Sequence, residues 1–303
     1  MTREQEQDAF LTRLIDEGFF IPLGSPGLFG RSSSFEDLVK GLEDFITTTT
    51  GETDILFFPP VMPREILERS GFMDSMPHLA GIVHCFCGQE RDIPQLKAKL
   101  VNGEDWGEYL SMTDLSHAPA ACYPLYPTCT GRLPPEGRLV ALSSTCFRHE
   151  PSPDPTRMQS FRMRELVRLD TSERVLAWRD SWIDRAIDFL QKLGLSPESE
   201  LASDPFFGRT GRVMASSQRE RELKFELVVK VYENGPPLAV MSLNYHEDHF
   251  GRQFDIQTAD GQIAHSACMG FGLERIVLSL LNKHGYSLDS WPEDVLQLLN
   301  FRQ

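Results

Sequence analysis

The sequence predicts an α+β fold in which a largely antiparallel β-sheet is flanked by helices. Runs typical of strands dominate the middle and the end of the chain. Two pairs of these runs are joined by proline-containing links, as neighbouring antiparallel strands often are. Helical patterns, with apolar residues three or four positions apart, flank the strands. Neither an internal repeat nor a long linker interrupts the 303 residues, so we expect a single domain, 1–303.

The N-terminal part predicts short elements. Ser34 precedes apolar residues spaced three or four apart, so a capped helix is expected over 36–48. Two prolines end a short apolar strand over 55–58. The Gly/Ser-rich run 24–34 is expected to be a loop, and 118–127, with its prolines, to be extended at best. The other elements expected here are helices over 10–20, 63–70 and 95–101 and a strand over 82–86.

The C-terminal part predicts longer strands and a long helix. Prolines that follow His149 force an irregular loop between strands over 139–149 and 159–169, so these strands form a long hairpin. A helix over 172–193 carries an apolar stripe. The other elements expected here are paired strands over 224–232 and 238–244, a strand over 254–257, and a helix over 269–281 entered through Gly270 and Gly272.

The composition is that of a globular protein, with 41% apolar and 24% charged residues. Thirty basic and 44 acidic side chains give a net charge of −14, which disfavours general nucleic-acid binding because phosphate contacts need clustered Lys and Arg. The sequence lacks the ~20 consecutive apolar residues that would span a bilayer. Residues 1–10 are polar and do not resemble a secretory signal. We therefore expect a cytoplasmic protein that does not bind membranes.

The six cysteines raise the question of a metal site. In a reducing compartment thiols serve metal binding, catalysis or core packing more often than disulfides. Cys122, Glu165 and Cys268 form a candidate metal-binding set, because three protein ligands with a fourth position open hold a catalytic zinc. Three core side chains are the alternative. Two other groups compete: 84–87, which is more typical of a core strand, and 246–249, which is more typical of a solvated loop.

Two segments carry arginines suited to phosphate. In Phe147-Arg148-His149-Glu150, the arginine at a strand end can fork onto phosphate oxygens, and Glu150 can receive an adenine amino group. Phe161 on the returning strand offers a ring for stacking. Gly270-Phe271-Gly272-Leu273-Glu274-Arg275 opens the predicted helix, where backbone N–H groups favour anions and Arg275 adds a charge beside a polyphosphate. A surface Arg–Glu pair and a plain helix N-terminus are the alternatives.

In this order, the two segments resemble the second and third signature motifs of the class II aminoacyl-tRNA synthetase catalytic core. Ile55-Leu56-Phe57-Phe58-Pro59-Pro60 resembles the first motif, whose proline lies at a dimer interface, so the resemblance implies a homodimer. Ala118-Pro119-Ala120-Ala121-Cys122 lies where such cores place their amino-acid loop, and Ser242-Leu243-Asn244 where seryl enzymes carry a Ser-Asn segment. The hairpin follows the seryl pattern at Arg148, Glu150, Arg157, Ser160, Phe161 and Glu165.

The cysteine–glutamate–cysteine set narrows the resemblance to the zinc-dependent seryl-tRNA synthetases of methanogens. Those enzymes have a large N-terminal tRNA-binding domain, whereas only a short segment precedes the first motif here. From about Phe35 to Leu281 the sequence is similar to the amino acid–carrier-protein ligases, which are truncated homologues with the same zinc site.

This resemblance implies an enzyme that uses ATP to activate glycine or alanine as an aminoacyl adenylate. The amino acid then passes to the phosphopantetheine thiol of an acyl or peptidyl carrier protein. Zn²⁺ is implied at Cys122, Glu165 and Cys268, and Mg²⁺ with ATP. Arg148 at the α-phosphate and Arg275 at the γ-phosphate are the implied catalytic residues. Glu150, Glu165 and Asn244 are implied for the amino acid. The implied ATP-binding residues are Arg148, Glu150, Arg157, Met158, Phe161, Ala239, Val240, Met241, Ser242 and Arg275.

The ligands of Mg²⁺ are left open by the sequence. Class II synthetases carry an acidic residue for this ion on the strand before the third motif. Here that strand reads Leu238-Ala239-Val240-Met241-Ser242 and has no carboxylate, and the nearest upstream is Glu233.

A local basic group predicts a carrier-docking surface. Between 208 and 224, five basic residues stand against Glu220 and Glu222 in an otherwise acidic chain. Carrier proteins are acidic around their phosphopantetheine serine, so a basic helix would steer them; an ordinary solvated helix is the alternative. The resemblance favours docking and implies an inserted helical segment over about 195–224, besides an N-terminal extension over 1–34. The candidate docking residues are Arg209, Arg212, Arg219, Arg221 and Lys224.

Other functions share part of this pattern. A tRNA-charging enzyme needs the same activation chemistry, but the charge of −14 and the short N-terminal segment disfavour it. A regulatory synthetase paralogue is expected to lose signature residues, and here both arginines and all three ligands are present. A carrier-free amide ligase would use the same adenylate. A structural zinc protein is disfavoured by the open coordination position.

Overall fold

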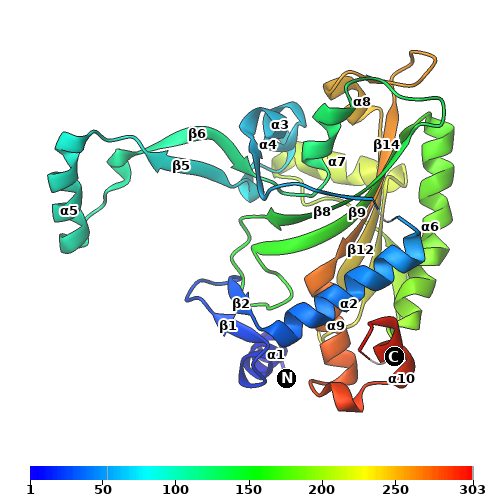
Figure 1. Cartoon of the computed structure of the whole chain (residues 1–303), viewed down its shortest axis with the longest axis horizontal. Coiled ribbons are helices and arrows are strands. Elements are labelled where there is room, and N and C mark those ends of the chain that lie inside the picture. Colours follow the sequence, from blue (N-terminus) through cyan, green and yellow to red (C-terminus); the bar gives the residue numbers. More distant parts are fainter. Residues whose placement is uncertain (53, 302–303) are drawn as a thin grey trace.

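The computed structural model describes residues 1–52 and 54–301 and contains a seven-stranded sheet in the order β10-β11-β12-β14-β9-β8-β3 (Figure 1). The pairs are antiparallel except β3 and β8, which are parallel. The α+β prediction with a largely antiparallel sheet is confirmed. The strands are β3 (Ile55–Phe57), β8 (Arg138–Phe147), β9 (Ser160–Asp170), β10 (Glu198–Leu201), β11 (Lys224–Val229), β12 (Leu238–Glu247) and β14 (His265–Gly272).

Helices cover one face of this sheet and bury its largest apolar cluster. Alternate residues of the strands, such as Leu166 of β9 and Phe271 of β14, point into this cluster and pack against the apolar stripes of the helices. The full burial of each large apolar side chain of such a stripe stabilises the fold by about 1.5–3 kcal/mol. The helices that contribute are α1 (Arg3–Asp16), α2 (Ser33–Thr50), α6 (Ser172–Lys192), α9 (Leu273–His284) and α10 (Glu293–Leu298).

Helix α2 shows how the sequence sets the ends of these helices. The Ser32 side chain accepts a hydrogen bond from the Phe35 backbone N–H at 3.4 Å, so the cap lies two residues before Ser34, the residue predicted to precede the helix. The helix ends at Gly51, whose φ of 74° is the left-handed conformation that glycine adopts readily. Helix α1 begins earlier than expected because Thr2 and Gln5 form a capping box.

Gly41 marks the closest approach between α2 and the C-terminal segment. A Cβ at this position would lie 2.3 Å from the Leu299 carbonyl oxygen, which belongs to backbone and cannot turn aside. We expect Gly41→Ala to lower the free energy of unfolding by about 1–3 kcal/mol, although alanine favours a helix. Chemical denaturation measures the change. Lys40→Ala, at an exposed position of the same helix, is the control and is expected to be neutral or stabilising.

The other face of the sheet carries a smaller apolar cluster and the segments that surround it. Val167 and Leu169 of β9, which alternate with the residues of the first face, pack there with Phe250 and Phe254. A third cluster lies beneath the short helices that follow β3. The elements on this side include η4 (Tyr123–Cys129), α3 (Arg64–Arg69), α4 (Phe72–Ser75), η1 (Pro77–Leu79), α7 (Gly208–Glu220) and α8 (His249–Gln253).

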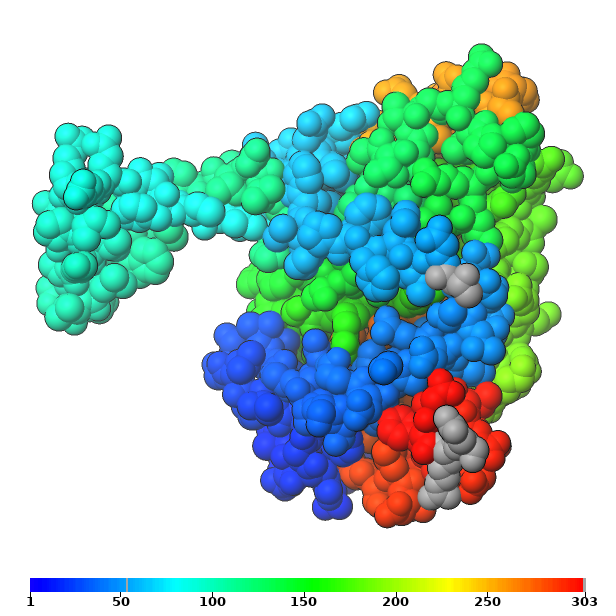
Figure 2. Space-filling model, viewed as in Figure 1, coloured from blue at the N-terminus to red at the C-terminus, as the bar shows by residue number. Residues whose placement is uncertain are grey.

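An arm extends away from the body of the molecule (Figures 1 and 2). It consists of β5 (Ile82–Phe86), α5 (Ile93–Asn102) and β6 (Leu110–His117), and β6 also pairs with β4 (Val61–Pro63). Apolar side chains on the arm are exposed, among them Val101 at 85%. The small strands that complete the fold are β1 (Phe20–Pro22) with β2 (Phe29–Arg31), and β7 (Gly131–Arg132) with β13 (Ile256–Gln257).

Three expectations from the sequence are wrong. The run 24–34 is not all loop, since it contains β2 and the start of α2. The segment 118–127 turns into the 3₁₀ helix η4 instead of staying extended. The helix expected over 269–281 begins only at Leu273, because Met269, Gly270 and Gly272 continue strand β14. Within the described residues, none of the helices is long and apolar enough to cross a membrane.

Candidate functional site

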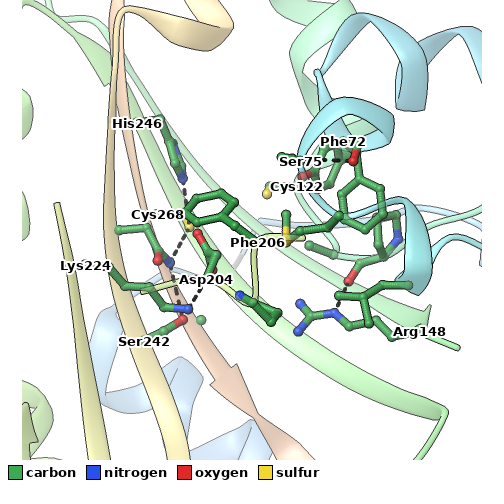
Figure 3. A pocket seen from close by; sticks show the side chains of 18 of the residues that line it. Phe72, Ser75, Cys122, Arg148, Asp204, Phe206, Lys224, Ser242, His246 and Cys268 are labelled. Atoms are coloured by element: carbon green, nitrogen blue, oxygen red, sulfur yellow. Dashed lines mark hydrogen bonds and ion pairs between the residues drawn. The ribbon is translucent and has the colours of Figure 1, made fainter. Parts of the chain in front are cut away.

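A cavity of about 890 Å³ opens on the sheet face opposite the main helical cluster (Figure 3). Its floor consists of β9, β14, β12 and β11, and its walls come from η4, α4, α7 and the first turn of α9. Most of the residues predicted for ATP, amino acid and metal line it. They are Cys122, Arg148, Glu150, Met158, Phe161, Glu165, Ala239, Val240, Met241, Ser242, Asn244, Cys268 and Arg275.

The strand register explains why residues from distant parts of the chain meet here. Ser242 lies opposite Gly270, and Gly270 lies opposite Glu165, so one row crosses three strands. In the next row on the same face, Asn244 lies opposite Cys268. Gly270 leaves space in the middle of this floor, because a Cβ there would lie 3.0 Å from the Met163 Cε.

One end of the cavity holds the candidate metal ligands. The ligand atoms of Cys122, Glu165 and Cys268 lie within 4.8 Å of one another, and all three side chains are buried. The Glu165 Oε1 accepts a hydrogen bond from the Ala121 N–H at 2.9 Å, whereas its Oε2 is buried without a hydrogen-bond partner among the described residues. Two sulfurs and an unpartnered carboxylate oxygen form a donor set that fits zinc, because they leave the metal a fourth position.

The pKa values of the side chains at this end of the cavity are strongly shifted. Burial raises the pKa of Glu165 to about 8, and the neighbouring Cys268 sulfur adds to the effect. A hydrogen bond between the two thiols raises the pKa of Cys122 and holds the pKa of Cys268 well below its ordinary value. Cys268 is therefore the sulfur of the pair that carries negative charge more readily, as a metal ligand must.

Two polar side chains orient the Cys268 sulfur. The Asn244 Nδ2 lies 3.3 Å from it. The His246 Nε2 lies 3.5 Å from it (Figure 3). The His246 Nδ1 in turn lies 3.0 Å from the Ser266 hydroxyl. Such outer contacts fix the position of a ligand. His246 thus belongs beside the metal set, although the sequence analysis placed it in a competing group.

The two competing groups do not form metal sites of their own in the described structure. The His249 Nε2 lies 2.8 Å from the Ser70 carbonyl oxygen, which binds α8 to the segment after α3. The group 84–87 lies on the arm, and its Cys85 and Cys87 are exposed instead of buried in a core strand. Among the described residues, the group whose side chains could together bind a metal ion is Cys122, Glu165 and Cys268.

Arg148 lies just after β8 and reaches the cavity from its side (Figure 3). Its Nε donates to the Pro119 carbonyl oxygen at 2.9 Å, and its guanidinium lies 5.3 Å from the centroid of the Phe161 ring. These contacts hold the planar fork in place, which suits bidentate binding of an anion. Arg157 is the predicted ATP-binding residue that does not line the cavity, and its Nη1 lies 3.4 Å from the Glu150 Oε2.

Arg275, in the first turn of α9, approaches the same region. Its Nε donates to the Thr156 carbonyl oxygen and its Nη1 to the Ala239 carbonyl oxygen, both at 3.0 Å. Burial and the positive charges of Arg148 and Arg157 lower its pKa to about 10. It therefore stays charged at neutral pH. The cavity thus has a cationic region at Arg148 and Arg275 and the sulfur–carboxylate set on the same floor.

The four candidate docking arginines lie outside the cavity. Arg209, Arg212 and Arg219 are exposed on α7, and Arg221 is exposed just after it. The Arg219 Nη1 donates to the Ser203 hydroxyl at 2.8 Å, and Arg221 pairs with Glu247. Other side chains of the same helix, including Met214 and Ser217, line the cavity. Helix α7 therefore forms a wall between the cavity and the basic outer surface.

Lys224 does not belong to this basic surface, so its placement among the docking residues is wrong. Lys224 is 8% exposed and lies on the cavity floor, where its Nζ contacts the Asp204 Oδ1 at 2.7 Å (Figure 3). The Nζ also lies 3.0 Å from the Glu226 Oε1. Lys224 is the first residue of β11, opposite Asn244, so the sheet register turns it inward.

Asp204, Phe206 and Glu226 are among the lining residues that sequence reasoning missed. Asp204 and Phe206 belong to the irregular segment between β10 and α7, where the sequence has no periodic pattern. The Phe207 N–H donates to the Ser75 carbonyl oxygen at 2.8 Å, which ties this segment to α4 across the cavity mouth. A signal existed for Glu226, because Lys224 and Glu226 alternate with apolar residues in the strand.

The chain is similar to curated proteins over almost its whole length. It is 42% identical over 290 residues to an amino acid–acyl-carrier-protein ligase 2 of Bradyrhizobium diazoefficiens, a match that covers 95% of the chain and 87% of that protein. It is 41% identical to ligase 1 of the same organism, with 96% and 90% covered. A type-2 serine–tRNA ligase of Methanococcus aeolicus is 25% identical, and the match covers 96% of the chain but 58% of that protein. The scan of family models found no match.

Solved structures share the fold. A seryl-tRNA synthetase of M. kandleri, solved with an A. aeolicus tRNA, superposes with a TM-score of 0.80 at 20% identity and covers 96% of the chain and 60% of the synthetase. The ATP complex of the Pyrococcus horikoshii seryl-tRNA synthetase gives a TM-score of 0.69 at 15% identity, with 97% and 63% covered. These similarities establish the class II synthetase fold that the signature segments predicted.

Proposed function

The chain belongs to the family of amino acid–carrier-protein ligases, and from this premise we propose that it activates glycine or alanine with ATP and transfers the aminoacyl group to the phosphopantetheine thiol of an acyl or peptidyl carrier protein. The observation that carries the proposal is the single cavity that joins two arginines to the cysteine–glutamate–cysteine set. One region suits the triphosphate, and the other suits the amino end of the amino acid.

The first proposed step forms an aminoacyl adenylate. A carboxylate oxygen of the amino acid attacks the α-phosphorus of ATP, and pyrophosphate leaves with the electron pair of the broken P–O bond. Arg148 neutralises the charge that develops on the α-phosphate oxygens, and Arg275 holds the γ-phosphate. Adenine lies between Phe161 and Arg275, and its amino group donates a hydrogen bond to the Glu150 carboxylate. Fixed cations in a site shielded from water lower such a barrier mainly by electrostatics and positioning.

The second proposed step forms a thioester. The carrier thiol, as thiolate, attacks the carbonyl carbon of the adenylate, and AMP leaves as the C–O bond to the phosphate breaks. The chain contributes by holding the adenylate at Arg148 while the thiol enters past α7. Holding the thiol and the adenylate next to each other in the right orientation accelerates the transfer step.

Cys122, Glu165 and Cys268 are the residues that would hold zinc. A zinc ion bound there supplies a Lewis acid with an open position for the neutral amino group of the substrate. The Ala121 N–H donates to the Glu165 carboxylate and orients it, and the Asn244 side chain positions the Cys268 sulfur. Tyr123 and Phe250, with ring centroids 5.9 Å apart, also line the cavity. The resemblance to the ligase family supports a small amino acid.

Carrier docking on α7 is the next part of the proposal. Arg209 and Arg212 make no ion pair among the described residues, so they are free to meet an acidic partner. We expect the double charge reversal R209E/R212E to raise the KM for the carrier by about tenfold or more, because like charges meet at the rim of the complex. Adenylate formation should not change. Carrier aminoacylation and ATP–pyrophosphate exchange measure the two steps.

A matched control separates docking from general charge. Lys40 and Lys97 are exposed on α2 and α5, outside the helix that lines the cavity, and make no ion pair among the described residues, so K40E/K97E changes the net charge equally. Equal losses of transfer in both double variants would contradict docking on α7. The losses should shrink as salt is added, because exposed charges are screened.

A homodimer and a cytoplasmic location complete the proposal. Strand β3 is the edge of the sheet, and its Phe57 is 74% exposed, which supports an interface at the first signature segment. Mass measurement in solution by light scattering tests the dimer.

The experiment that tests the function is the intact mass of a phosphopantetheine-loaded carrier protein after incubation with the zinc-loaded enzyme, MgATP and a mixture of amino acids. We expect a mass increase equal to one glycyl or alanyl group. No increase with several carriers from the same genome, while amino-acid-dependent pyrophosphate exchange persists, would contradict the transfer step and favour tRNA or another acceptor.

A further inference from the structure

Glu233, the nearest carboxylate upstream of strand β12, does not reach the cavity. It lies between β11 and β12, its side chain is 81% exposed, and its Oε2 lies 2.8 Å from the Lys230 Nζ. It is absent from the lining of the cavity. If a carboxylate of this chain holds the ion of MgATP, it therefore belongs to another residue.

Glu226 lies where such a carboxylate is needed. It is directly opposite Ser242 in the pairing of β11 with β12, and Ser242 is directly opposite Gly270. Side chains paired in this way project from the same face of the sheet, with Cβ atoms about 4.5–5.5 Å apart. Both Glu226 and Ser242 line the cavity. The carboxylate and the hydroxyl therefore face the same space, one strand away from the position that lacks an acid.

The charges around Glu226 place it at the phosphate end of the cavity. Its negative charge is among the influences that favour the charged form of Arg275. Its Oε1 contacts the Lys224 Nζ at 3.0 Å, whereas no hydrogen bond involves its Oε2 among the described residues. The side chain is 25% exposed, so it is open to a ligand in the cavity.

Six other carboxylates line the cavity. Asp74 lies on α4, away from the floor strands, the Glu150 Oε2 lies 3.4 Å from the Arg157 Nη1, and Glu247 pairs with Arg221. Glu274 is 1% exposed and accepts hydrogen bonds at 2.7 Å from the backbone N–H and the Nε of Arg162. Asp204 holds Lys224 and accepts from the Gln218 Nε2 at 2.8 Å. Glu165 belongs to the metal set at the other end. Glu226 is thus the carboxylate on the floor that combines exposure with a position next to Ser242.

We propose that Glu226, together with the Ser242 hydroxyl, holds the Mg²⁺ of MgATP. The inference rests on the proposed function, since it concerns the nucleotide of that reaction. Magnesium takes oxygen ligands and is usually bound by one or two carboxylates plus substrate phosphates and water, which this pair supplies. Asp204, Lys224 and Glu226 carry a net charge of −1, and Lys224 keeps its 2.7 Å contact with Asp204 when a Glu226 oxygen turns to the cation.

The test compares nucleotide binding with and without the ion, so that it does not depend on turnover. Calorimetry measures the Kd of the zinc-loaded full chain for ATP in excess magnesium and in EDTA-free, magnesium-free buffer. Electron paramagnetic resonance of Mn²⁺ with ATP counts the bound ion directly. For Glu226→Gln we expect MgATP to bind at least tenfold more weakly than to the unmodified chain. The affinity for magnesium-free ATP should be unchanged or higher, because a negative charge beside the phosphates is removed.

Glu247→Gln is the matched control, because Glu247 is another carboxylate of the floor strands that lines the cavity, but it pairs with Arg221 and does not contact Lys224. This variant removes the same charge and should leave the magnesium dependence of ATP binding unchanged. An equal loss in both variants would overturn the proposal and show that the loss of any cavity carboxylate weakens the binding of MgATP. An unchanged magnesium dependence in Glu226→Gln would overturn it too.

Ser242→Ala keeps the proposal testable if Glu226→Gln does not fold. It removes the second oxygen ligand without leaving an unpaired charge, and we expect a smaller loss, about threefold to tenfold, confined to MgATP. No loss would contradict the pair. Failure of the unmodified chain to bind ATP in either buffer would instead contradict the proposed function, so the two failures are distinguishable.

Discussion

Cys268→Ala is expected to remove zinc and amino-acid-dependent activation together. Asn244 and His246 are arranged around the Cys268 sulfur, and its loss leaves only two of the three candidate ligands. Two ligands do not hold zinc against solvent. A Lewis acid contributes several kcal/mol to a reaction, so we expect amino-acid-dependent pyrophosphate exchange to fall about a thousandfold.

Metal content and exchange rate must be measured on the same sample. Mass spectrometry of the metals should give one zinc per chain for the unmodified protein and none for the variant. Cys146→Ala is the control, because Cys146 is fully buried in the same apolar cluster but is not part of the ligand set. It should keep zinc and activity. A zinc-free Cys268→Ala protein with undiminished exchange would show that the metal assignment is wrong.

Arg148→Ala is expected to abolish adenylate formation while leaving the metal in place. Arg148 combines a fixed guanidinium with an open position on the cavity, and removal of one preorganised donor to a developing charge typically costs about 10²–10³ in kcat. Arg148→Lys should recover little, because a lysine cannot form the planar two-point contact. Pyrophosphate exchange measures the loss.

Arg157→Ala provides a graded comparison. Arg157 is half-exposed and outside the cavity lining, so its removal should reduce exchange by about tenfold at most, the range expected for a solvent-screened contact. Zinc content should stay at one per chain in both arginine variants. If Arg157→Ala reduced exchange as much as Arg148→Ala, the catalytic role would have to be shared between them.

Much of the fold was predictable because its strands alternate and its hairpins carry turn residues. The hairpin of β8 and β9 follows from the prolines between two long strands. Strand β14 was missed because Cys268-Met269-Gly270-Phe271-Gly272 has no alternation of polar and apolar residues, since both faces of this strand are buried. Its glycines suggested a helix entrance, whereas Gly270 serves to keep the cavity floor open.

The candidate site was predictable as a set of residues but not as an arrangement. The motifs identified the arginines and the ligands, and all three ligands meet in the structure. Lys224 was misplaced because a run of basic residues looks like one exposed surface, although a strand begins at Lys224 and turns it inward. Asp204 and Phe206 were missed because no local pattern marks a residue that crosses the mouth of a cavity.

The order of strands in the sheet also governs when the site comes into existence as the protein folds. Strand β14 pairs with β9 and β12, so the floor is complete only after segments far apart in the sequence have closed long loops. Contacts of this kind slow folding. A nascent chain therefore cannot assemble the cysteine–glutamate–cysteine set until Cys268 has been synthesised and strand β14 has paired with β9.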